Sequence, residues 1–258
     1  MAVDAAVTWR TSGTPRLIPV VLALLVWFVP LNSFLWWLTR AWGLGTEGPV
    51  LLEDASLVVL AVAIVAWARW WRQTGLVGPW RQPWWALAAA ALLAEQLLLT
   101  QARLPVPRAP VLLAAVLLDA VLIGLGEELL CRGVLLYGLG RYGVLVAGLV
   151  SSAVFGLGHI SPLSGWPPSY QVVNAIIAAQ GGLLFAGLRL RMNSLWPLVV
   201  THGAFDVPAL LAGSTFHPAP IGLFAALIST GLFLPAAMVG LGLLLWDHLN
   251  GTDRWADT

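Results

Sequence analysis

Apolar residues fill long stretches of the chain, and short segments rich in polar residues, glycine and proline separate them. A helix needs about 20 predominantly apolar residues to cross the hydrocarbon core of a bilayer. Stretches close to this length occupy residues 17–38, 50–68, 84–101, 110–137, 144–160, 171–188, 194–212 and 220–246. The pattern predicts an all-α fold, a polytopic membrane helix bundle of about eight transmembrane helices.

The segments between these stretches are short and carry turn residues, as in RLPVPRAP at 103–110 and SPLSGWPP at 161–168. None of them is long enough to hold a soluble domain, and no internal repeat is visible in the sequence. We therefore expect residues 1–258 to form a single membrane domain.

The composition agrees with a membrane protein. Charged residues make up only 10% of the sequence, whereas soluble domains carry about 25%, so the chain has too little charge to cover a water-facing surface. The formal net charge of +1 also provides no basic surface for nucleic acid. The lipid bilayer is the expected surrounding, and no nucleic-acid partner is expected.

The arginines predict an orientation. With the N-terminus inside, the cytoplasmic segments hold Arg10, Arg16, Arg69, Arg72, Arg81, Arg141, Arg189, Arg191 and Arg254, and the outer loops hold Arg40, Arg103 and Arg108. Because cytoplasmic loops carry an excess of basic residues, we expect both termini in the cytoplasm. The sequence contains no Lys, a bias typical of GC-rich genomes, so the expected location is the cytoplasmic (inner) membrane of a prokaryote.

Ionisable residues inside the predicted spans are few and grouped. Each costs about 2.5–3.5 kcal/mol on insertion scales, and such residues usually face the bundle interior. They are Glu127, Glu128 and Arg132 in the fourth span, His159 at the end of the fifth, and His202 and Asp206 in the seventh. The grouping predicts one polar site among these three spans.

Helix geometry predicts how these side chains pair. Glu128 and Arg132 are four residues apart and share a face, whereas Glu127 points about 100° away, so we expect it to face a different neighbour. His202 and Asp206 are also four residues apart, so Asp206 is expected to hold the imidazole in one tautomer.

The depths that the sequence predicts for the site residues do not agree with one another. Spans four and five fold back around residues 141–143, which places Glu127 and His159 at similar depths, roughly 22–25 Å from that turn at 1.5 Å per residue. His202 lies only about 11 residues past Arg191, so the same rise per residue predicts a shallower position for it. Either span four extends beyond the bilayer or span seven sits deeper.

Three motifs occur in order on these spans. EELLCR at 127–132 fits EExxxR, FGLGH at 155–159 fits FxxxH, and HGAFD at 202–206 fits HxxxN/D. In this the chain resembles the CPBP (Abi) family of intramembrane proteases, whose best-known members are the CAAX prenyl endopeptidases. The resemblance covers about residues 110–212, which would form the catalytic core.

The resemblance implies an endopeptidase that hydrolyses a peptide bond of a membrane-embedded or lipid-anchored substrate. Glu127 would be the general base that activates water, and His159 would share that water. Glu128 and Arg132 would hold the architecture and tune the pKa of the pair. A base works best when its pKa lies near the operating pH.

Further roles follow from the same resemblance. His202 would stabilise the tetrahedral oxyanion, with Asp206 orienting it. Many family members carry Asn at position 206, and an ionised Asp cannot donate a hydrogen bond to an oxyanion. Phe155 is only a weak substrate-binding candidate, because packing is its preferred interpretation. Cys131 stands where the family often has an aromatic residue, and we interpret it as a small buried residue rather than a nucleophile.

The sequence is compatible with a metal-dependent or a metal-free reaction. Members of the family are often described as metalloproteases, and Glu127, His159 and His202 would be the ligands if a metal such as zinc is bound. The sequence contains no HExxH motif, and adjacent glutamates on a regular helix cannot both chelate one ion. A metal-free glutamate mechanism is therefore preferred.

Two other classes of function stay open. A proton-coupled transporter also buries carboxylates and histidines, but it typically shows repeat symmetry, which this sequence lacks. A non-catalytic membrane scaffold or bacteriocin-immunity protein of the same fold is the more serious alternative. Such a protein would tolerate loss of the motif residues, whereas this chain keeps them all, which favours an enzyme.

Overall fold

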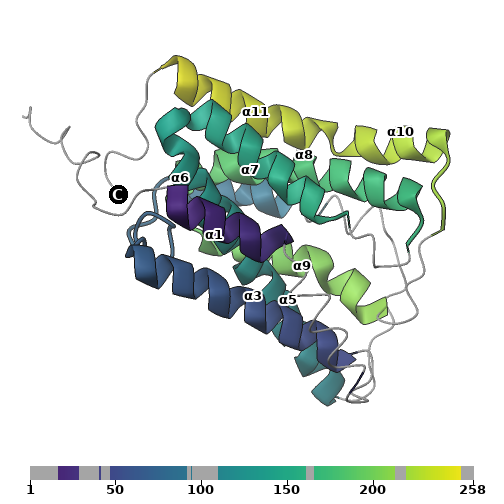
Figure 1. Ribbon diagram of the computed structural model, residues 1–258. Helices are drawn as coiled ribbons and strands as arrows, with labels where there is room; N and C mark the ends of the chain where they lie inside the picture. Colours follow the sequence, from purple (N-terminus) through teal and green to yellow (C-terminus); the bar gives the residue numbers. More distant parts are fainter. Residues whose placement is uncertain are drawn as a thin grey trace, which may run out of the picture.

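The structure is a computed structural model, and it describes residues 17–28, 41, 47–91, 94, 110–160, 166–212 and 219–250. Within these ranges the regular structure is helical and contains no strand, which confirms the all-α fold class (Figure 1). The α-helices are α1 (Leu17–Phe28), α3 (Glu47–Ala68), α5 (Pro110–Glu128), α6 (Leu136–Leu139), α7 (Val144–Gly158), α8 (Pro168–Met192), α9 (Trp196–Ala212), α10 (Leu223–Leu232) and α11 (Leu234–Leu249).

Most predicted spans correspond to helices. A π-helical segment, Leu129–Leu135, joins α5 to α6, so that Pro110–Tyr142 is one apolar helical stretch of 33 residues. The predicted span 220–246 is instead a pair, α10 and α11, bent by 45°. Residues 29–38 and 95–101, which complete the predicted first and third spans, lie outside the described residues.

Three helices of the described part are long and apolar enough to cross a membrane, and the bent α10–α11 pair makes a fourth. Helices α1 and α7 are apolar but shorter. The count of about eight spans therefore stays a prediction, whereas the apolar helical bundle is confirmed.

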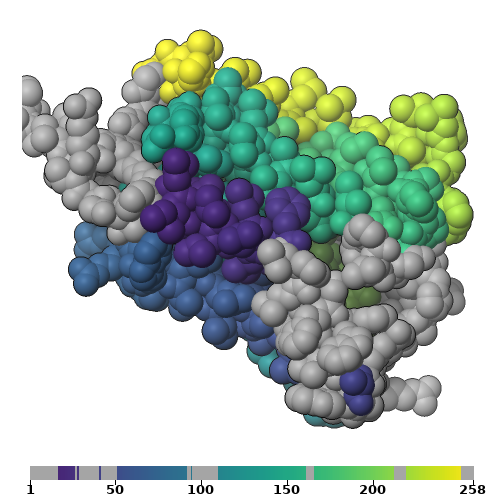
Figure 2. Space-filling view, in the orientation of Figure 1, coloured from purple at the N-terminus to yellow at the C-terminus, as the bar shows by residue number. Residues whose placement is uncertain are grey.

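The helices surround the π-helical segment, all of whose residues are buried. Helix α8 packs between α7 and α11, and α5 packs between α3 and α9 (Figure 1). Figure 2 shows α1 lying across one face, between α3 and the helices above it. Large apolar side chains such as Val21, Phe224 and Leu249 are exposed on the outer helices, as expected for a surface that contacts lipid.

Helices α5 and α9 approach each other backbone to backbone. A Cβ atom added at Gly124 would meet the Val199 carbonyl oxygen, and one added at Gly203 would meet the Ala120 carbonyl oxygen. Small residues allow this close approach in membrane helix pairs. The two contacts also fix an antiparallel register, in which the start of α9 lies beside the end of α5.

The arginines outside the motifs gather at one end of the bundle. Arg189 Nη2 donates to the Gln73 carbonyl at 2.9 Å, which ties the loop after α3 to the end of α8. At the same end Arg191 Nη2 lies 3.0 Å from Asp247 Oδ1 of α11. Arg10, Arg16, Arg40, Arg103, Arg108 and Arg254 lie outside the described residues.

Candidate active site

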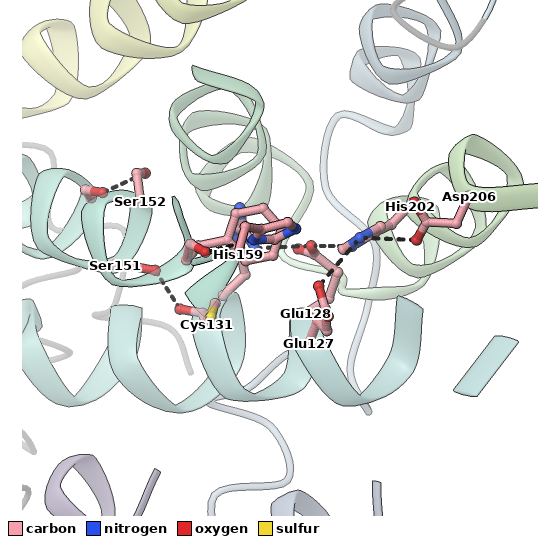
Figure 3. A network of polar contacts seen from close by, with 11 residues as sticks. Glu127, Glu128, Cys131, Ser151, Ser152, His159, His202 and Asp206 are labelled. Atoms are coloured by element: carbon pink, nitrogen blue, oxygen red, sulfur yellow. Dashed lines mark hydrogen bonds and ion pairs between the residues drawn. The ribbon is translucent and has the colours of Figure 1, made fainter. Parts of the chain in front are cut away.

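Glu128 is the central residue of the polar cluster (Figure 3). It ends α5, and its Oε1 accepts a hydrogen bond from Arg132 Nη1 at 3.0 Å. The same oxygen lies 2.8 Å from Nδ1 of His202 on α9. Because a carboxylate oxygen accepts and does not donate, His202 donates through Nδ1–H. The side chains of Glu128 and Arg132 have no exposed surface.

The other nitrogen of His202 faces two more carboxylates. Nε2 lies 3.5 Å from Glu127 Oε2 and 3.4 Å from Asp206 Oδ2. Glu128 pairs with Arg132, and Glu127 faces a different neighbour, His202, as expected. The sequence did not predict that Glu128 also reaches His202, so that the two glutamates lie at opposite nitrogens of one imidazole.

The tautomer of His202 is also fixed differently from the expectation. The hydrogen bond on Nδ1 comes from Glu128, and Asp206 faces Nε2 at ion-pair distance. Glu128 and His202 are 74 residues apart, so helix periodicity alone could not pair them. The only signal in the sequence was that both belong to the motif set.

His159 caps the C-terminal end of α7. Its Nδ1 lies 2.9 Å from the Phe155 carbonyl oxygen, which only accepts, so Nδ1 carries the hydrogen and Nε2 is the acceptor nitrogen. The Phe155 ring packs edge-on against His159 at 4.8 Å and against His202 at 5.6 Å. Phe155 thus packs against both histidines, as its interpretation as a packing residue predicts.

The cluster has a closed side and an open side. Glu128 and Arg132 are fully buried, whereas 19% of the Glu127 side chain and 29% of the Asp206 side chain are exposed. Glu127 Oε2 is itself buried and has no hydrogen-bond partner among the described residues. The partly exposed side chains of Glu127 and Asp206 mark the side from which a water molecule or substrate can reach the cluster.

The common depth of these residues comes from the α5–α9 register. Gly124 against Val199 and Gly203 against Ala120 bring the start of α9 beside the last turns of α5, and from there the His202 side chain reaches Glu128 Oε1 at 2.8 Å. The shallow position calculated for His202 is therefore wrong. The stretch Pro110–Tyr142 has 33 residues, more than the about 20 that a bilayer requires, which agrees with a fourth span extending beyond the bilayer.

A family model described as "Type II CAAX prenyl endopeptidase Rce1-like" matches residues 109–208 of the chain. This match confirms the resemblance to CAAX-type proteases and contains every motif residue. No curated protein and no solved structure matches the chain.

Among the described residues no three His, Cys, Asp or Glu side chains are arranged to hold a metal ion. His159 bonds the Phe155 carbonyl through Nδ1 and keeps Nε2 as an acceptor. Nε2 of His202 faces Glu127 and Asp206. The reaction proposed below has no metal-bound step.

Sequence reasoning missed one aromatic residue of the site. Phe185 of α8 is buried, and its ring centroid lies 6.3 Å from that of His202 and 5.7 Å from Arg132 Cζ. Helix α8 carries none of the three motifs, so nothing in their pattern pointed to it. Cys131 is fully buried, in agreement with its interpretation as a small core residue.

Proposed function

We propose that this protein is an intramembrane endopeptidase that hydrolyses a peptide bond of a membrane-embedded or lipid-anchored substrate. The observation that carries the proposal is Glu127. Its side chain is partly exposed, and its buried Oε2, which has no hydrogen-bond partner among the described residues, lies 3.5 Å from Nε2 of a histidine that buried groups hold in place. The Rce1-like match supports the reaction class. The apolar helices support an integral membrane location.

In the proposed reaction Glu127 removes a proton from a water molecule, and the water oxygen attacks the substrate carbonyl carbon. His159 helps to orient this water, because its Nε2 is available as an acceptor. The C–N bond then breaks, and Glu127 returns the proton to the leaving nitrogen. The balance is one water consumed, with one carboxyl and one amine produced.

His202 is proposed to stabilise the oxyanion. Its Nδ1–H is engaged by Glu128, so Nε2 is the nitrogen that faces the open side. In the imidazolium form, Nε2–H donates to the negative oxygen of the tetrahedral intermediate. Glu128 and Arg132 hold this ring from the closed side and do not themselves touch the substrate.

The orientation is part of the proposal. The described arginines outside the motifs, Arg69, Arg72, Arg81, Arg141, Arg189 and Arg191, support a cytoplasmic position for their end of the bundle. Both termini would then lie in the cytoplasm, and the membrane would be the cytoplasmic membrane of a prokaryote.

The test is a cleavage experiment in membranes of the producing cell. Wild type is compared with Glu127→Gln and His159→Ala, each matched for folded protein, and uncleaved membrane peptides are identified by mass spectrometry. His248→Ala is the matched control, since His248 is exposed near the end of α11. We expect both site variants to accumulate the same peptide, and the control to accumulate none.

If both site variants behave as wild type for every peptide, hydrolysis is the wrong function. The polar cluster would then serve a membrane scaffold or immunity protein. Accumulation in the His248→Ala control would indicate a general effect on the membrane rather than loss of a catalytic group.

A further inference from the structure

The surroundings of Arg132 are unusual for a buried cation. Its side chain is fully buried, and Nη1 donates a hydrogen bond to Glu128. Nε and Nη2 have no hydrogen-bond partner among the described residues. Since a buried charge is costly unless it is compensated, other groups must hold the guanidinium in place.

Two aromatic rings supply part of this compensation. Arg132 Cζ lies 4.0 Å from the ring centroid of Phe155 and 5.7 Å from that of Phe185. Both distances are within the range of cation–π attraction, which is worth about 2 kcal/mol or more when the pair is desolvated. Phe155 belongs to a motif, but Phe185 comes from α8.

A glycine of α8 supplies the space. A Cβ atom added at Gly182 would lie 2.9 Å from Arg132 Nη2 and 3.2 Å from Ser152 Cβ. Gly182 and Phe185 are three residues apart, so they share one face of α8. On this face of α8, Gly182 leaves room for the guanidinium, and the Phe185 ring, about one turn further along, lies near it.

We propose that Gly182 and Phe185 of α8 are positioning residues for the active site. They fix the Arg132 guanidinium, which fixes the Glu128 carboxylate, which in turn holds Nδ1 of His202. Helix α8 thus contributes residues to a site whose three motifs lie on other helices. This inference rests on the proposed hydrolytic function, because the residues act through His202.

The geometry separates positioning from simple packing. A methyl group at position 182 would come closest to Nη2, the far end of the Arg132 side chain, and next to Cβ and Cα of Ser152 at 3.2 and 3.3 Å. The guanidinium therefore has to move furthest, and Ser152 by a few tenths of an ångström. Catalysis is sensitive to such a movement, since a misplacement of about 1 Å in a catalytic array can cost about 100-fold in rate.

The chain provides a matched control in the neighbouring glycine. A Cβ atom added at Gly181 would have no atom within 4 Å. We expect Gly182→Ala to lower kcat by about 10- to 100-fold and to leave KM unchanged. Gly181→Ala should keep the wild-type kcat. Equal kcat values for the two variants would overturn the proposal.

A double-mutant cycle tests the mechanism of the effect. Lys has no Nη2 atom, so Gly182→Ala should change kcat much less in an Arg132→Lys background than in wild type. The same fold-change in both backgrounds would show that the methyl group acts on something other than Arg132.

A second measurement does not depend on activity. The arginine Nε–Hε NMR signal that disappears in Arg132→Lys belongs to Arg132, and it should shift in Gly182→Ala and Phe185→Leu but stay in place in Gly181→Ala. If the Arg132 signal does not shift in Gly182→Ala and Phe185→Leu, Gly182 and Phe185 do not position Arg132. If wild type cleaves no peptide at all, the proposed function fails, and this signal still decides whether α8 holds Arg132.

Discussion

At the scale of single residues, Glu128 connects the charged groups of the site. One oxygen contacts both Arg132 and His202, so the cation and the imidazole are held by one carboxylate. Removing one partner of a fully buried pair leaves an uncompensated charge, at a cost of about 3–5 kcal/mol. Both the stability of the protein and its proposed activity therefore depend on Glu128.

We predict that Glu128→Ala lowers the free energy of unfolding by about 3–5 kcal/mol and abolishes hydrolysis. The reason is that buried Arg132 loses its carboxylate and His202 loses the acceptor on Nδ1. Equilibrium unfolding in detergent measures the first effect, with His248→Ala at the exposed end of α11 as the control. An unfolding free energy equal to that of wild type would contradict this role.

Asp206 is the second residue with a sharp expectation. It is the last residue of the HxxxN/D motif, and it lies 3.4 Å from His202 Nε2. Asn has the same shape, and its amide oxygen can accept from Nε2–H as a carboxylate oxygen does. We predict that Asp206→Asn keeps most of the activity, whereas Asp206→Ala, which no longer orients His202, loses about 100-fold in kcat.

Steady-state cleavage of the peptide found by mass spectrometry measures both variants. If Asp206→Asn is as inactive as Asp206→Ala, the reaction requires an ionisable group at this position. A role limited to accepting from His202 Nε2–H would then be wrong.

At the scale of the elements, the contact between α5 and α9 decides whether a site forms. It depends on Gly124 and Gly203, at which a side chain would collide with the backbone of the opposite helix. Backbone atoms cannot turn away as a flexible side chain can. Any side chain at these positions would therefore separate the glutamates from His202.

We predict that Gly203→Ala destabilises the protein by about 1–3 kcal/mol, the usual cost of overpacking, and also lowers kcat. Gly242→Ala on α11 is the control, because its Cβ would have no atom within 4 Å. Unfolding and cleavage are measured on the same samples. If Gly203→Ala and Gly242→Ala are equally stable and active, the close α5–α9 contact is not required.

The π-helical segment Leu129–Leu135 is the other decisive element. π-Helical segments are rare in proteins as a whole, but those that occur are often found at functional sites. Its Cys131 carbonyl accepts a hydrogen bond from Ser151 Oγ of α7 at 2.6 Å, so a side chain of a neighbouring helix bonds the backbone of this segment. This contact joins the helix that carries Arg132 to the helix that ends at His159.

At the scale of the whole molecule, the described arginines outside the motifs lie at one end of the bundle. The ion pair Arg191–Asp247 joins α8 to α11 at the arginine end, and Arg141 lies in the turn between α6 and α7. The connection between α7 and α8, which includes Trp166, lies at the opposite end. This asymmetry allows the proposed orientation to be tested.

We predict that a cysteine at position 141 faces the cytoplasm and that one at position 166 faces the opposite side. Cys131 is the only cysteine, so Arg141→Cys and Trp166→Cys in a Cys131→Ala background give single labelling sites. A membrane-impermeant maleimide should label the first only in inverted vesicles and the second only in intact spheroplasts. The reverse pattern would invert the orientation, and labelling from one side only would contradict the topology.

The sequence by itself determined the local features of this protein. The apolar stretches predicted helices at 50–68, 110–137, 144–160, 171–188 and 194–212, and each is helical in the structure. The spacing of Glu128 and Arg132 predicted their pairing, because residues four apart on a helix share a face. These features depend only on hydropathy and on the period of the α-helix.

The tertiary structure alone decided how the helices meet. The contact of Glu128 with His202, the shared depth of the site and the participation of Gly182 and Phe185 all depend on the register between helices. In a membrane, lipid is as apolar as the helix surfaces, so burial does not select a register, and close packing of small residues does. Which glycines face a neighbouring backbone or side chain cannot be read from periodicity, and this is why α8 became part of the site only in three dimensions.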